Sequence, residues 1–386
     1  MSSPQSPESA LIPNRMPEPG TRHRIVVGMS GGVDSSVVAA LLKEQGHDVI
    51  GVFMKNWDEV DENGVCPAEQ DFADVIQVCE RIDIPYFSVN FVQEYWDNVF
   101  QNFVHEYQAG RTPNPDILCN REIKFKAFFD QALSLGAEFL ATGHYARIGL
   151  DAATQEAQLL KGTDPGKDQS YFLHAIKSTA LEKVLFPIGS IHKTEVRRLA
   201  EKYQLATRAK KDSTGICFIG ERNFPEFLAR YVKPTPGAFR TLDGKKVGEH
   251  VGMQFYTLGQ RKGLGLGGQG DPWFVVAKDI QKNIVYVERG TDHPALYSKE
   301  LLASELTWIS QKAPDLSQPV SLRAKVRYRQ SDQACTLLGL NPQGKLRVRF
   351  EEPQRAVTPG QSVVFYQDDL CLGGGIIDAA FAESAD

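Results

Sequence analysis

The sequence predicts an α/β protein with a parallel sheet, followed by a small β-rich central part and a C-terminal antiparallel β-barrel. Three observations support this class. Apolar strand-like runs alternate with helix-like segments through about the first two hundred residues, which is typical of a parallel sheet covered on both faces. After about Lys211 the helical pattern fades and many glycines punctuate short β-like runs. From about Leu301 the chain shows short alternating strands joined by turns, which predict a small barrel or sandwich.

The elements of the α/β part follow one another in a regular order. A buried strand at residues 25–29 leads through a Ser/Gly loop into a helix at about residues 35–45, which stops at Gly46. A second apolar strand follows at residues 48–53. The alternation continues with a helix at 70–81, a strand at 84–89, a helix at 125–135 and a strand at 139–142. This order predicts parallel strands joined by helices.

The C-terminal part carries short strands with alternating apolar residues, which we expect at residues 320–328, 334–340, 346–350 and 362–365. Basic residues alternate with apolar ones near two of these strands, so on a strand the cations share one face. They are Arg323, Lys325, Arg327 and Arg329, then Lys345, Arg347 and Arg349. Such a face is either the solvated outside of a barrel or a surface for a phosphate backbone, and the pattern leaves both open.

Length and composition favour a folded protein of several domains. The chain has 386 residues, of which 42% are hydrophobic and 24% charged, and this is ordinary globular usage. At about 150 residues per domain, this length suggests two or three domains. We expect a disordered, proline-rich tail at residues 1–22, the α/β domain at 23–210, a central β-rich domain at 211–295 and the barrel at 296–386.

Cysteine usage, charge and apolar runs exclude several classes. The six cysteines include no C-x-x-C pair, which disfavours a secreted disulfide scaffold and a four-cysteine metal or iron–sulfur site. The net charge of −5 means that a polyanion must be held by a local basic patch. No apolar run approaches the ~18 residues of a membrane helix, and the N-terminal segment lacks the order of a signal peptide. We expect a soluble cytoplasmic protein without a membrane partner.

The first chemical signal is GMSGGVDSS at residues 28–36, between the first strand and the first helix. Its glycines allow close backbone approach, the helix N-terminus offers N–H groups to an anion, and Ser30, Ser35 and Ser36 add hydroxyl donors. The loop lacks the lysine of a Walker A motif and the spacing of a dinucleotide-binding fingerprint. A lone Gly-Gly pair here is most simply a tight turn with a serine N-cap. The whole string in this position indicates a phosphate-binding loop.

Two segments carry candidate catalytic thiols. In TPNPDILCNREIKF at residues 112–125 the two prolines delay the helix, so we expect Asp116 and Cys119 at its exposed start and on one side. A helix N-terminus stabilises a thiolate, which makes Cys119 a candidate nucleophile, although a buried structural cysteine is the commoner case. Cys217, in STGICFIG at residues 213–220, is equally well explained as a core residue between two apolar neighbours.

The phosphate loop resembles the pyrophosphate loop of the N-type ATP pyrophosphatases, which split ATP into AMP and pyrophosphate and adenylate a carbonyl oxygen. Further strings follow in the order found in the tRNA-specific 2-thiouridylases, and this resemblance spans about Arg24 to the end of the chain. The strings are KNW at residues 55–57, CPAEQD at 66–71, the segments at 112–125 and 213–220, TGHY at 142–145, KDQSY at 167–171 and TLGQR at 257–261. The family implies a Rossmann-like ATP pyrophosphatase domain as the catalytic part.

The resemblance implies ATP-dependent 2-thiolation of the wobble uridine, position 34, in bacterial tRNAs for Lys, Glu and Gln. Adenylation of the uracil C2 oxygen precedes sulfur transfer from a persulfide on Cys217, with Cys119 as the second catalytic thiol and Asp116 handling protons. ATP and Mg²⁺ are the implied cofactors, and a sulfur-relay protein or a cysteine desulfurase is the implied donor. We expect a monomer that binds one tRNA, in part through its barrel.

The same resemblance assigns binding positions. The ATP-contacting positions are Gly28, Met29, Ser30, Gly31, Gly32, Val33, Asp34, Ser35, Met54 and Gly143, with Asp34 near the metal and the phosphates. The positions that contact tRNA are Asn114, Pro115 and Asp116 around the flipped base, and His144, Lys167, Asp168, Gln169, Arg327, Tyr328 and Gln361 elsewhere. No cluster of side chains is expected to hold a metal ion by itself. A lone histidine is more often a packing residue, so His144 rests on the resemblance alone.

Two other functions fit parts of the sequence. An amide-forming ligase of the ATP pyrophosphatase group would adenylate a carboxylate and would need no paired thiols. A non-catalytic RNA-binding adaptor would keep the nucleotide fold and bind tRNA without releasing pyrophosphate. The intact string from Ser30 to Ser35 argues against the adaptor.

Overall fold

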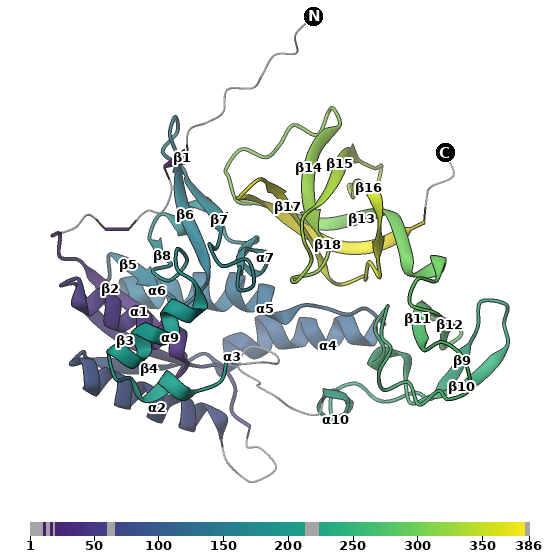
Figure 1. The fold of residues 1–386 in the computed structure, drawn as a ribbon, viewed down its shortest axis with the longest axis horizontal. Helices are drawn as coiled ribbons and strands as arrows, with labels where there is room; N and C mark the ends of the chain where they lie inside the picture. The colour runs from purple at the N-terminus through teal and green to yellow at the C-terminus, as the bar shows by residue number, and fades with distance from the viewer. Residues whose placement is uncertain (1–10, 13–15, 18–19, 60–65, 213–223, 383–386) are drawn as a thin grey trace, which may run out of the picture.

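The computed structural model describes residues 11–12, 16–17, 20–59, 66–212 and 224–382. Its strands form three sheets, and Figure 1 shows an α/β part on the left, a barrel at the upper right and a small sheet at the lower right. The three regions follow one another along the chain in the predicted order, so the predicted fold class is confirmed. None of the described helices is both long enough and apolar enough to cross a membrane.

The α/β part is built on a five-stranded parallel sheet in the order β4-β3-β2-β5-β8. Its strands are β2 (Arg24–Met29), β3 (Asp48–Lys55), β4 (Tyr86–Asn90), β5 (Phe139–Ala141) and β8 (Val184–Leu185). Alternate residues of β2 enter different cores, with Ile25 and Val27 on one face and Val26 on the other. Both faces of the central strands are therefore buried, which explains their nearly continuous apolar sequence.

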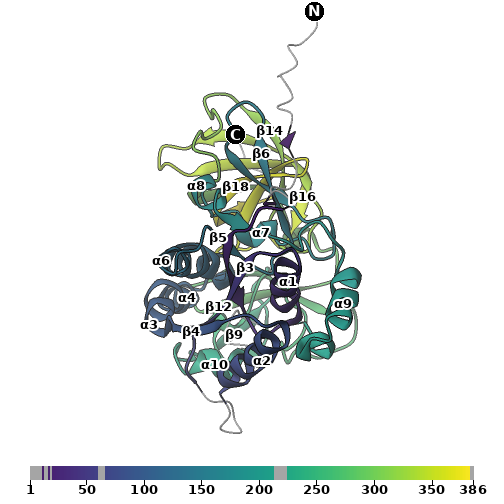
Figure 2. The same ribbon diagram turned by 90° about the vertical axis from the view of Figure 1, so that its left-hand side faces the viewer.

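Helices cover both faces of this sheet, as Figure 2 shows. The first face carries α1 (Val33–Glu44), α2 (Pro67–Ile82) and α9 (Lys193–Lys202). The second face carries α3 (Val92–Tyr95), η1 (Trp96–Phe100), α4 (Gln101–Gln108), α5 (Pro115–Leu118), η2 (Cys119–Ala127) and α6 (Phe128–Ser134). Three short segments complete this part: α7 (Ser170–Leu173), α8 (Ser178–Leu181) and η3 (Ala206–Ala209).

The predicted elements of this part are confirmed, with shifted ends. The first helix begins at Val33 because Gly32 is extended (φ −96°, ψ 168°) and serves as its N-cap. The helix predicted at residues 125–135 begins earlier, at Pro115, and passes through the π-helical stretch η2 with a kink at Phe125 (φ −104°, ψ 19°). π-helical turns are rare and are frequent at functional sites. Here the π-helical stretch begins at Cys119.

A β-hairpin joins the α/β part to the C-terminal barrel. Its strands are β6 (Ala146–Asp151) and β7 (Ala157–Lys161), and β7 pairs antiparallel with β18 of the barrel. On the other edge, β6 pairs with the two-residue strand β1 (Leu11–Ile12). This pairing differs from the expectation of disorder at residues 1–22, because a sheet edge offers hydrogen bonds that composition does not reveal. Most of that tail lies outside the described residues.

The central part is a four-stranded sheet in the order β10-β9-β12-β11. Its strands are β9 (Gly237–Arg240), β10 (Lys246–His250), β11 (Trp273–Asp279) and β12 (Ile284–Arg289). The helical segments around it are α10 (Phe224–Ala229), η4 (Met253–Phe255) and η5 (Pro294–Leu296). Phe239, Val275 and Val285 form part of a separate small core. The glycine-rich sequence therefore folds as the β-rich part that its composition predicts.

The C-terminal part is an antiparallel barrel in which β17 pairs with both β14 and β18, and this closes the ring. The strands are β13 (Tyr297–Trp308), β14 (Val320–Lys325), β15 (Gln333–Leu340), β16 (Leu346–Arg355), β17 (Ser362–Gln367) and β18 (Leu370–Phe381). Leu301, Leu337 and Val348 are among the fully buried residues inside it. Closure removes the exposed sheet edges and confirms the predicted barrel.

The prediction that Arg323, Lys325, Arg327 and Arg329 share one strand face is wrong. Strand β14 ends at Lys325, so the two later arginines lie in the turn that follows it. Lys325 is itself buried, and its Nζ lies 3.4 Å from Asp168 and 3.6 Å from Asp332. A buried cation must be paired, and the carboxylates that pair with it come from segments that sequence periodicity does not place.

The second set of cations is paired with carboxylates. Arg347 and Arg349 donate through Nε to the two carboxylate oxygens of Glu300, at 2.7 and 2.5 Å, and Glu300 is only 2% exposed. Lys345 lies just before β16 and forms an ion pair with Asp378 at 3.1 Å. Carboxylates within the barrel therefore balance the charge of Lys345, Arg347 and Arg349, and these three cations give no argument for a phosphate ligand on this face.

Candidate active site

The phosphate loop lies between β2 and α1, at the carboxyl end of the central strand of the sheet. The Ser30 N–H donates to Ser35 Oγ at 3.1 Å, and the Ser36 hydroxyl donates to the Gly32 carbonyl at 2.7 Å. Gly31 has φ +70°, and a Cβ on it would lie 2.6 Å from the Asp71 carbonyl oxygen. These contacts fix a tight loop whose close packing against α2 requires glycine at position 31.

Gly143 follows β5 and meets this loop from the neighbouring strand. A Cβ on Gly143 would lie 2.8 Å from the Ser35 backbone nitrogen. The structure therefore brings together the predicted ATP-contacting loop at residues 28–35 and Gly143, as expected at the edge where an open parallel sheet binds ligands. Met54, near the end of β3, is buried and belongs to the apolar cluster on the second face of the sheet.

Asp34, in the first turn of α1, is held by two partners. Its carboxylate accepts from the Tyr145 hydroxyl at 2.7 Å and from Lys193 Nζ at 2.7 and 2.9 Å. Burial and the adjacent Asp34 charge raise the pKa of Tyr145, so this hydroxyl stays protonated and donates. Lys193, the first residue of α9, is only 12% exposed and also pairs with Asp212 at 2.8 Å.

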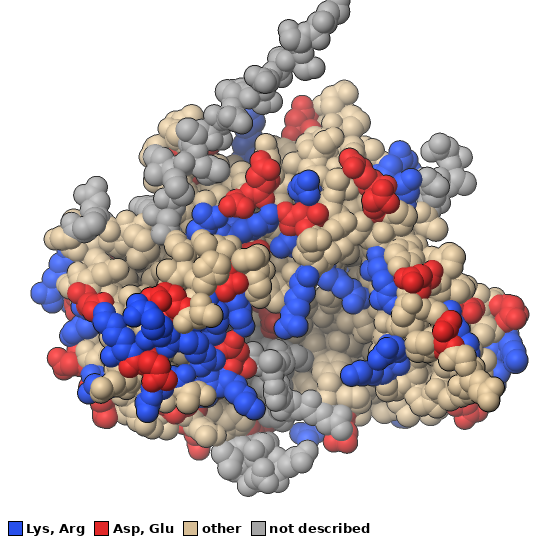
Figure 3. All heavy atoms as spheres, in the orientation of Figure 1, with Lys and Arg blue, Asp and Glu red and all other residues tan. Residues whose placement is uncertain are grey.

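Further cations surround the phosphate loop. Lys210 Nζ donates to the Gly31 carbonyl at 3.0 Å and to Asp71 and Asp74 at 2.8 and 2.6 Å. Burial lowers the pKa of Lys210, but the bonds to these two carboxylates outweigh it, so the net pKa is raised. Figure 3 shows Lys and Arg side chains gathered around α9 on this side of the molecule. The loop is therefore bordered by Lys193 and Lys210, which ion pairs with Asp34, Asp71, Asp74 and Asp212 hold in place.

Asp212 organises a second group of these cations. It accepts from Lys167 at 2.7 Å and from Arg197 at 2.6 Å, in addition to its pair with Lys193. Burial raises the pKa of Asp212, but hydrogen bonds from Lys167 and Lys193 outweigh it and hold this pKa at about 2. The carboxylate is therefore ionised at every pH above about 3 and keeps the three cations close to the phosphate loop.

The residues of this site fit ATP and a phosphate-bound Mg²⁺. Backbone N–H groups at the start of α1, the serine hydroxyls, Lys193 and Lys210 are the donors that anionic phosphates require. Within the described ranges, no group of three or more His, Cys, Asp or Glu side chains could hold a metal ion alone. Mg²⁺ is usually held by one or two carboxylates together with substrate phosphates. Asp34 fits as such a carboxylate, since it lies in the first turn after the loop.

The segment of the first candidate thiol begins a helix as predicted. Asn114 caps α5, its side chain accepting from the Asp116 N–H at 3.2 Å, and Pro115 occupies the first turn. The expectation that Cys119 is exposed is wrong, because its exposed fraction is 0%. Asp116 is partly exposed, whereas Cys119 lies in the apolar cluster that also contains Met54 and Phe128. The helix turns the thiol into this cluster, toward the sheet.

The second candidate thiol, Cys217, lies outside the described residues. The described residue before this segment is Asp212, which is bonded to Lys193 beside the phosphate loop. The described residue after it is Phe224, whose ring lies 5.5 Å from Tyr107 of α4. The two described flanks therefore lie on different faces of the sheet, Asp212 beside the phosphate loop and Phe224 against α4.

The predicted tRNA-contacting residues divide into two groups, and the first group lies at the contacts of the barrel with the segment before α5 and with the central part. Gln361 Nε2 donates to the carbonyls of Thr112 and Pro113 at 2.8 and 3.3 Å. Arg327 Nη2 donates to the carbonyls of Leu258 and Ala356, both at 3.0 Å. Gln361 of the barrel therefore holds the two residues directly before the predicted base-receiving segment at Asn114, Pro115 and Asp116, whereas Arg327 joins the barrel to Leu258 of the central part.

The second group surrounds the turn at residues 164–169. Tyr328 packs against Phe172 with ring centroids 4.4 Å apart, and Lys167 reaches Asp212. Asp168 is buried and accepts from the Gly162 and Ser170 N–H groups, while the Gln169 side chain accepts from the Tyr145 N–H. The carboxylate of Asp168 is thus engaged inside the protein.

His144 is buried beside Phe125 and Phe186, and its Nδ1 lies 2.8 Å from Thr142 Oγ1. Burial, followed by the charge of Lys124, lowers the pKa of His144 well below its usual value. This histidine is therefore neutral in the described structure. It has the surroundings of a packing residue, which is the alternative that the sequence left open.

Sequence reasoning missed Lys193, Lys210 and Asp212 as members of this site. The pair of Lys193 with Asp34 joins residues 159 positions apart, so no local spacing indicates it. A weak signal was present, since Lys210 and Asp212 directly precede the segment of the second candidate thiol.

A phosphate loop at the carboxyl end of a parallel sheet, surrounded by lysines and followed by two β-rich parts, defines an ATP-using α/β protein. The chain matches the family described as tRNA methyl transferase HUP domain over residues 23–221. It also matches the tRNA methyl transferase PRC-barrel domain over residues 225–289 and the aminomethyltransferase beta-barrel domain over residues 298–377.

Relatives that match nearly the whole length of the chain identify the particular family. The chain is 58% identical over 358 residues to the tRNA-specific 2-thiouridylase MnmA of Staphylococcus aureus strain bovine RF122 / ET3-1, covering 93% of this chain and 96% of that protein. The protein of the same name from S. aureus strain JH9 gives the same values. The chain belongs to the tRNA-specific 2-thiouridylase family.

The similarity of this chain to solved structures is weaker than its similarity to these relatives. A 4-thiouridine synthetase in complex with RNA and ATP is 15% identical, with a TM-score of 0.33, over 54% of this chain and 50% of that one. Values this low carry no inference about function.

Proposed function

We propose that this protein converts the wobble uridine of tRNA, position 34, to 2-thiouridine in an ATP-dependent reaction. The observation that carries the proposal is the link from Asp34 of the phosphate loop through Lys193 to Asp212, the described residue nearest to the segment of Cys217. This link supports the proposal that ATP activation and sulfur delivery take place at one site. Sulfur transfer accounts for the two thiol segments better than the methyl transfer named in the family descriptions.

Activation of the uracil solves a leaving-group problem. Oxygen on C2 leaves poorly, but AMP attached to that oxygen leaves well. In the first step the C2 oxygen attacks the α-phosphorus of ATP, forming a C–O–P linkage and releasing pyrophosphate. The N–H groups and hydroxyls of the phosphate loop bind the departing pyrophosphate, and Lys193 and Lys210 stabilise its developing charge. A phosphate-bound Mg²⁺, held by Asp34, would supply further charge neutralisation there.

Sulfur delivery then uses both thiols. Cys217 carries a persulfide, and its terminal sulfur attacks C2 of the adenylated base. Cys119 attacks the Cys217 sulfur as a thiolate, which forms a Cys119–Cys217 disulfide, leaves the terminal sulfur on C2 and lets AMP depart. In a second version Cys119 attacks first and releases hydrosulfide, which then attacks C2. In both versions a thiol reductant restores the two cysteines, and Asp116 accepts the proton released during the reaction.

The base reaches this site by leaving the anticodon stack. Asn114, Pro115 and Asp116 receive it, and Gln361 supports this segment through the Thr112 and Pro113 carbonyls. Extrusion of one base costs a few kcal/mol and costs least in a single-stranded loop. Burial of Cys119 keeps solvent away from the reacting sulfur until the base is in place.

The substrates and partners follow from the family. We propose tRNAs for Lys, Glu and Gln as acceptors, and a sulfur-relay protein or a cysteine desulfurase as the donor. The remaining tRNA positions, His144, Lys167, Asp168, Gln169, Arg327 and Tyr328, complete the proposed RNA surface. The reaction is placed in the cytoplasm because its substrate is tRNA, and one monomer is expected to bind one tRNA.

Replacing Cys217 with serine tests the proposal. Thiolated product, measured by mass spectrometry of digested tRNA, is expected to disappear, while a Cys335→Ser variant, altered in the barrel core, keeps it. Thiolation at the wild-type level in the Cys217→Ser protein would contradict the role of Cys217, and pyrophosphate release without thiolated product in the wild type would favour an amide-forming ligase. Binding of tRNA by the wild type without pyrophosphate release would favour a non-catalytic adaptor.

A Lys193→Gln variant is expected to raise the KM for ATP about tenfold or more and to leave the KM for tRNA nearly unchanged. The physical reason is the loss of a charge-assisted donor beside the phosphates, which contributes about 1.5–3 kcal/mol. Initial rates of pyrophosphate release at varied ATP measure it. Arg198→Gln is the matched control, because Arg198 lies on the same helix, is 67% exposed and pairs with Glu195. Equal KM values for the two variants would contradict a role for Lys193 at the phosphates.

A further inference from the structure

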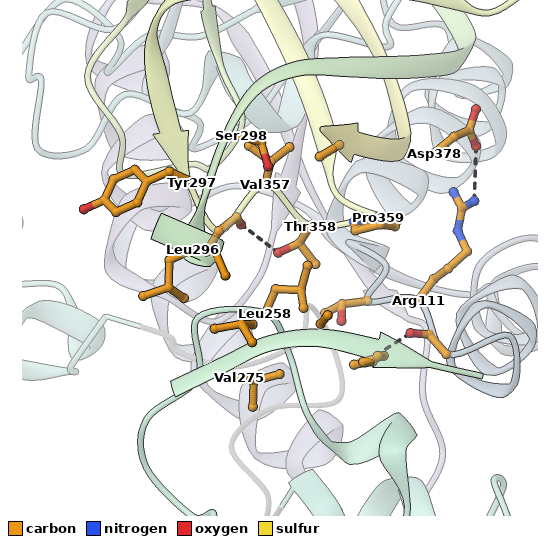
Figure 4. Close-up of a pocket in the computed structure, with 18 of the residues that line it drawn as sticks. Arg111, Leu258, Val275, Leu296, Tyr297, Ser298, Val357, Thr358, Pro359 and Asp378 are labelled. Carbon is orange, nitrogen blue, oxygen red and sulfur yellow. Dashed lines mark hydrogen bonds and ion pairs between the residues drawn. The ribbon is translucent and has the colours of Figure 1, made fainter. Parts of the chain in front are cut away.

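A cavity of about 530 Å³ lies where the C-terminal end of α4, the central sheet and the barrel meet. Figure 4 shows its walls, with Val275 of β11 below, Leu296 and Val357 above, and Arg111 at one side. The volume falls within the range of about 300–1,000 Å³ that small-ligand sites occupy. The cavity is separate from the phosphate loop, since no residue of that loop lines it.

One cation that lines this cavity has no counter-charge among the described residues. Lys278 of β11 donates through Nζ to the Gly110 carbonyl at 3.1 Å and forms no ion pair with the described residues. Burial lowers the pKa of Lys278 to about 8. Arg111, on the same wall, is by contrast paired with Glu106 at 2.7 Å and with Asp378 at 3.1 Å. A half-buried amine without a carboxylate is costly unless an anion joins it.

The cavity borders the segment that is proposed to receive the base. Its wall at residues 109–112 runs directly into Pro113 and Asn114, and two residues of chain span at most about 7 Å. Arg327 donates to the lining residues Leu258, Ala356 and Thr358. A ligand in this cavity therefore lies beside both the base-receiving segment and a proposed tRNA contact.

We propose that this cavity binds a nucleotide of the tRNA that flanks the thiolated uridine, with Lys278 contacting its phosphate. The proposal rests on the proposed function, because it takes the base to lie at Asn114 to Asp116. When one base leaves the stack, the sugar–phosphate backbone on each side must run close to the site that holds it. The apolar walls suit a sugar and a base face, and the single uncompensated cation suits one phosphate.

Lys278 also has a purely structural explanation. Its bond to the Gly110 carbonyl places a cation at the C-terminal end of α4, where the helix dipole favours positive charge. Such a cap affects stability, but it does not change how tRNA binding depends on salt. A binding experiment at several salt concentrations therefore distinguishes a helix cap from a phosphate contact.

The test measures tRNA affinity across a salt series for the wild type, Lys278→Gln and Lys282→Gln. Lys282 is the matched control, because it lies in the turn between β11 and β12, is 70% exposed and pairs with Asp279. We expect Lys278→Gln to weaken binding roughly fivefold at low salt and to reduce the slope of log K against log salt by about 0.7. Lys282→Gln should leave both unchanged, and Lys278→Arg should restore both.

Several outcomes would overturn the inference. A Lys278→Gln protein with a lower melting temperature but an unchanged salt slope would show a helix cap only. Binding of free uridine 5′-monophosphate that depends on Lys278, without any change in tRNA binding, would show a mononucleotide site instead. If the wild type thiolates tRNA and the Lys278→Gln slope equals that of the control, the cavity proposal alone fails. If the wild type forms no 2-thiouridine, the proposed function itself fails.

Discussion

Cys119→Ser is expected to reduce 2-thiouridine formation by about 10³-fold or more, because the hydroxyl cannot attack a sulfur of the Cys217 persulfide. ATP binding and pyrophosphate release should remain, since Cys119 lies in the apolar cluster on the opposite face of the sheet from α1. The variant should therefore form the adenylated base and release pyrophosphate, but it should not complete the transfer of sulfur. Mass spectrometry of tRNA digests, run beside a pyrophosphate assay, measures both steps on one sample.

Because Cys119 is buried, Cys119→Ser can lower the stability of the protein as well as remove the thiol, so a second variant must control for the effect on packing. Cys119 is 0% exposed, and serine in an apolar cluster leaves a hydroxyl to be satisfied. Cys79→Ser provides the comparison, because Cys79 of α2 is also 0% exposed and belongs to the core on the other face. Loss of thiolation in both variants, or retention in Cys119→Ser, would contradict a catalytic role for Cys119.

Gly31→Ala is expected to lower ATP-dependent activity by about 100-fold or more. Its φ of +70° disfavours any side chain, and the new Cβ would lie 2.6 Å from the Asp71 carbonyl oxygen. The clash is with backbone, so the loop must shift, and a shift near 1 Å in a positioned site costs about 10²-fold. Equilibrium ATP binding and pyrophosphate release measure the effect.

Gly244→Ala separates backbone strain from the phosphate-loop clash. Gly244 also has a positive φ, +92°, but a Cβ there meets nothing within 4 Å. Alanine at this position should cost about 1 kcal/mol of unfolding free energy and leave activity unchanged. If Gly31→Ala binds ATP as tightly as Gly244→Ala does, the loop at residues 28–35 is not the phosphate site.

Much of the fold could be predicted because its signals are local. The buried run at residues 25–29 and the glycine-rich turn after it fix a strand and a loop, and the alternating C-terminal strands fix the barrel. The phosphate loop was found for the same reason, since strand, turn and helix N-terminus are consecutive in sequence.

What could not be predicted depends on contacts between distant segments. Lys193 reaches Asp34 over 159 positions, and Arg347 and Arg349 converge on Glu300 from another strand. Alternating basic residues predict that the cations lie on one face of a strand, but they do not predict which carboxylate pairs with those cations. The burial of Cys119 is similar, because only the packing of η2 against the sheet decides which way the thiol turns.

The most direct test of the central claim is a reconstituted reaction with this protein, unmodified tRNA, ATP, Mg²⁺ and sulfide. The account predicts 2-thiouridine at position 34 and one pyrophosphate released for each thiolated uridine. No product should form when ATP is omitted. Thiolation that proceeds without ATP, or pyrophosphate release that never leads to 2-thiouridine, would contradict it.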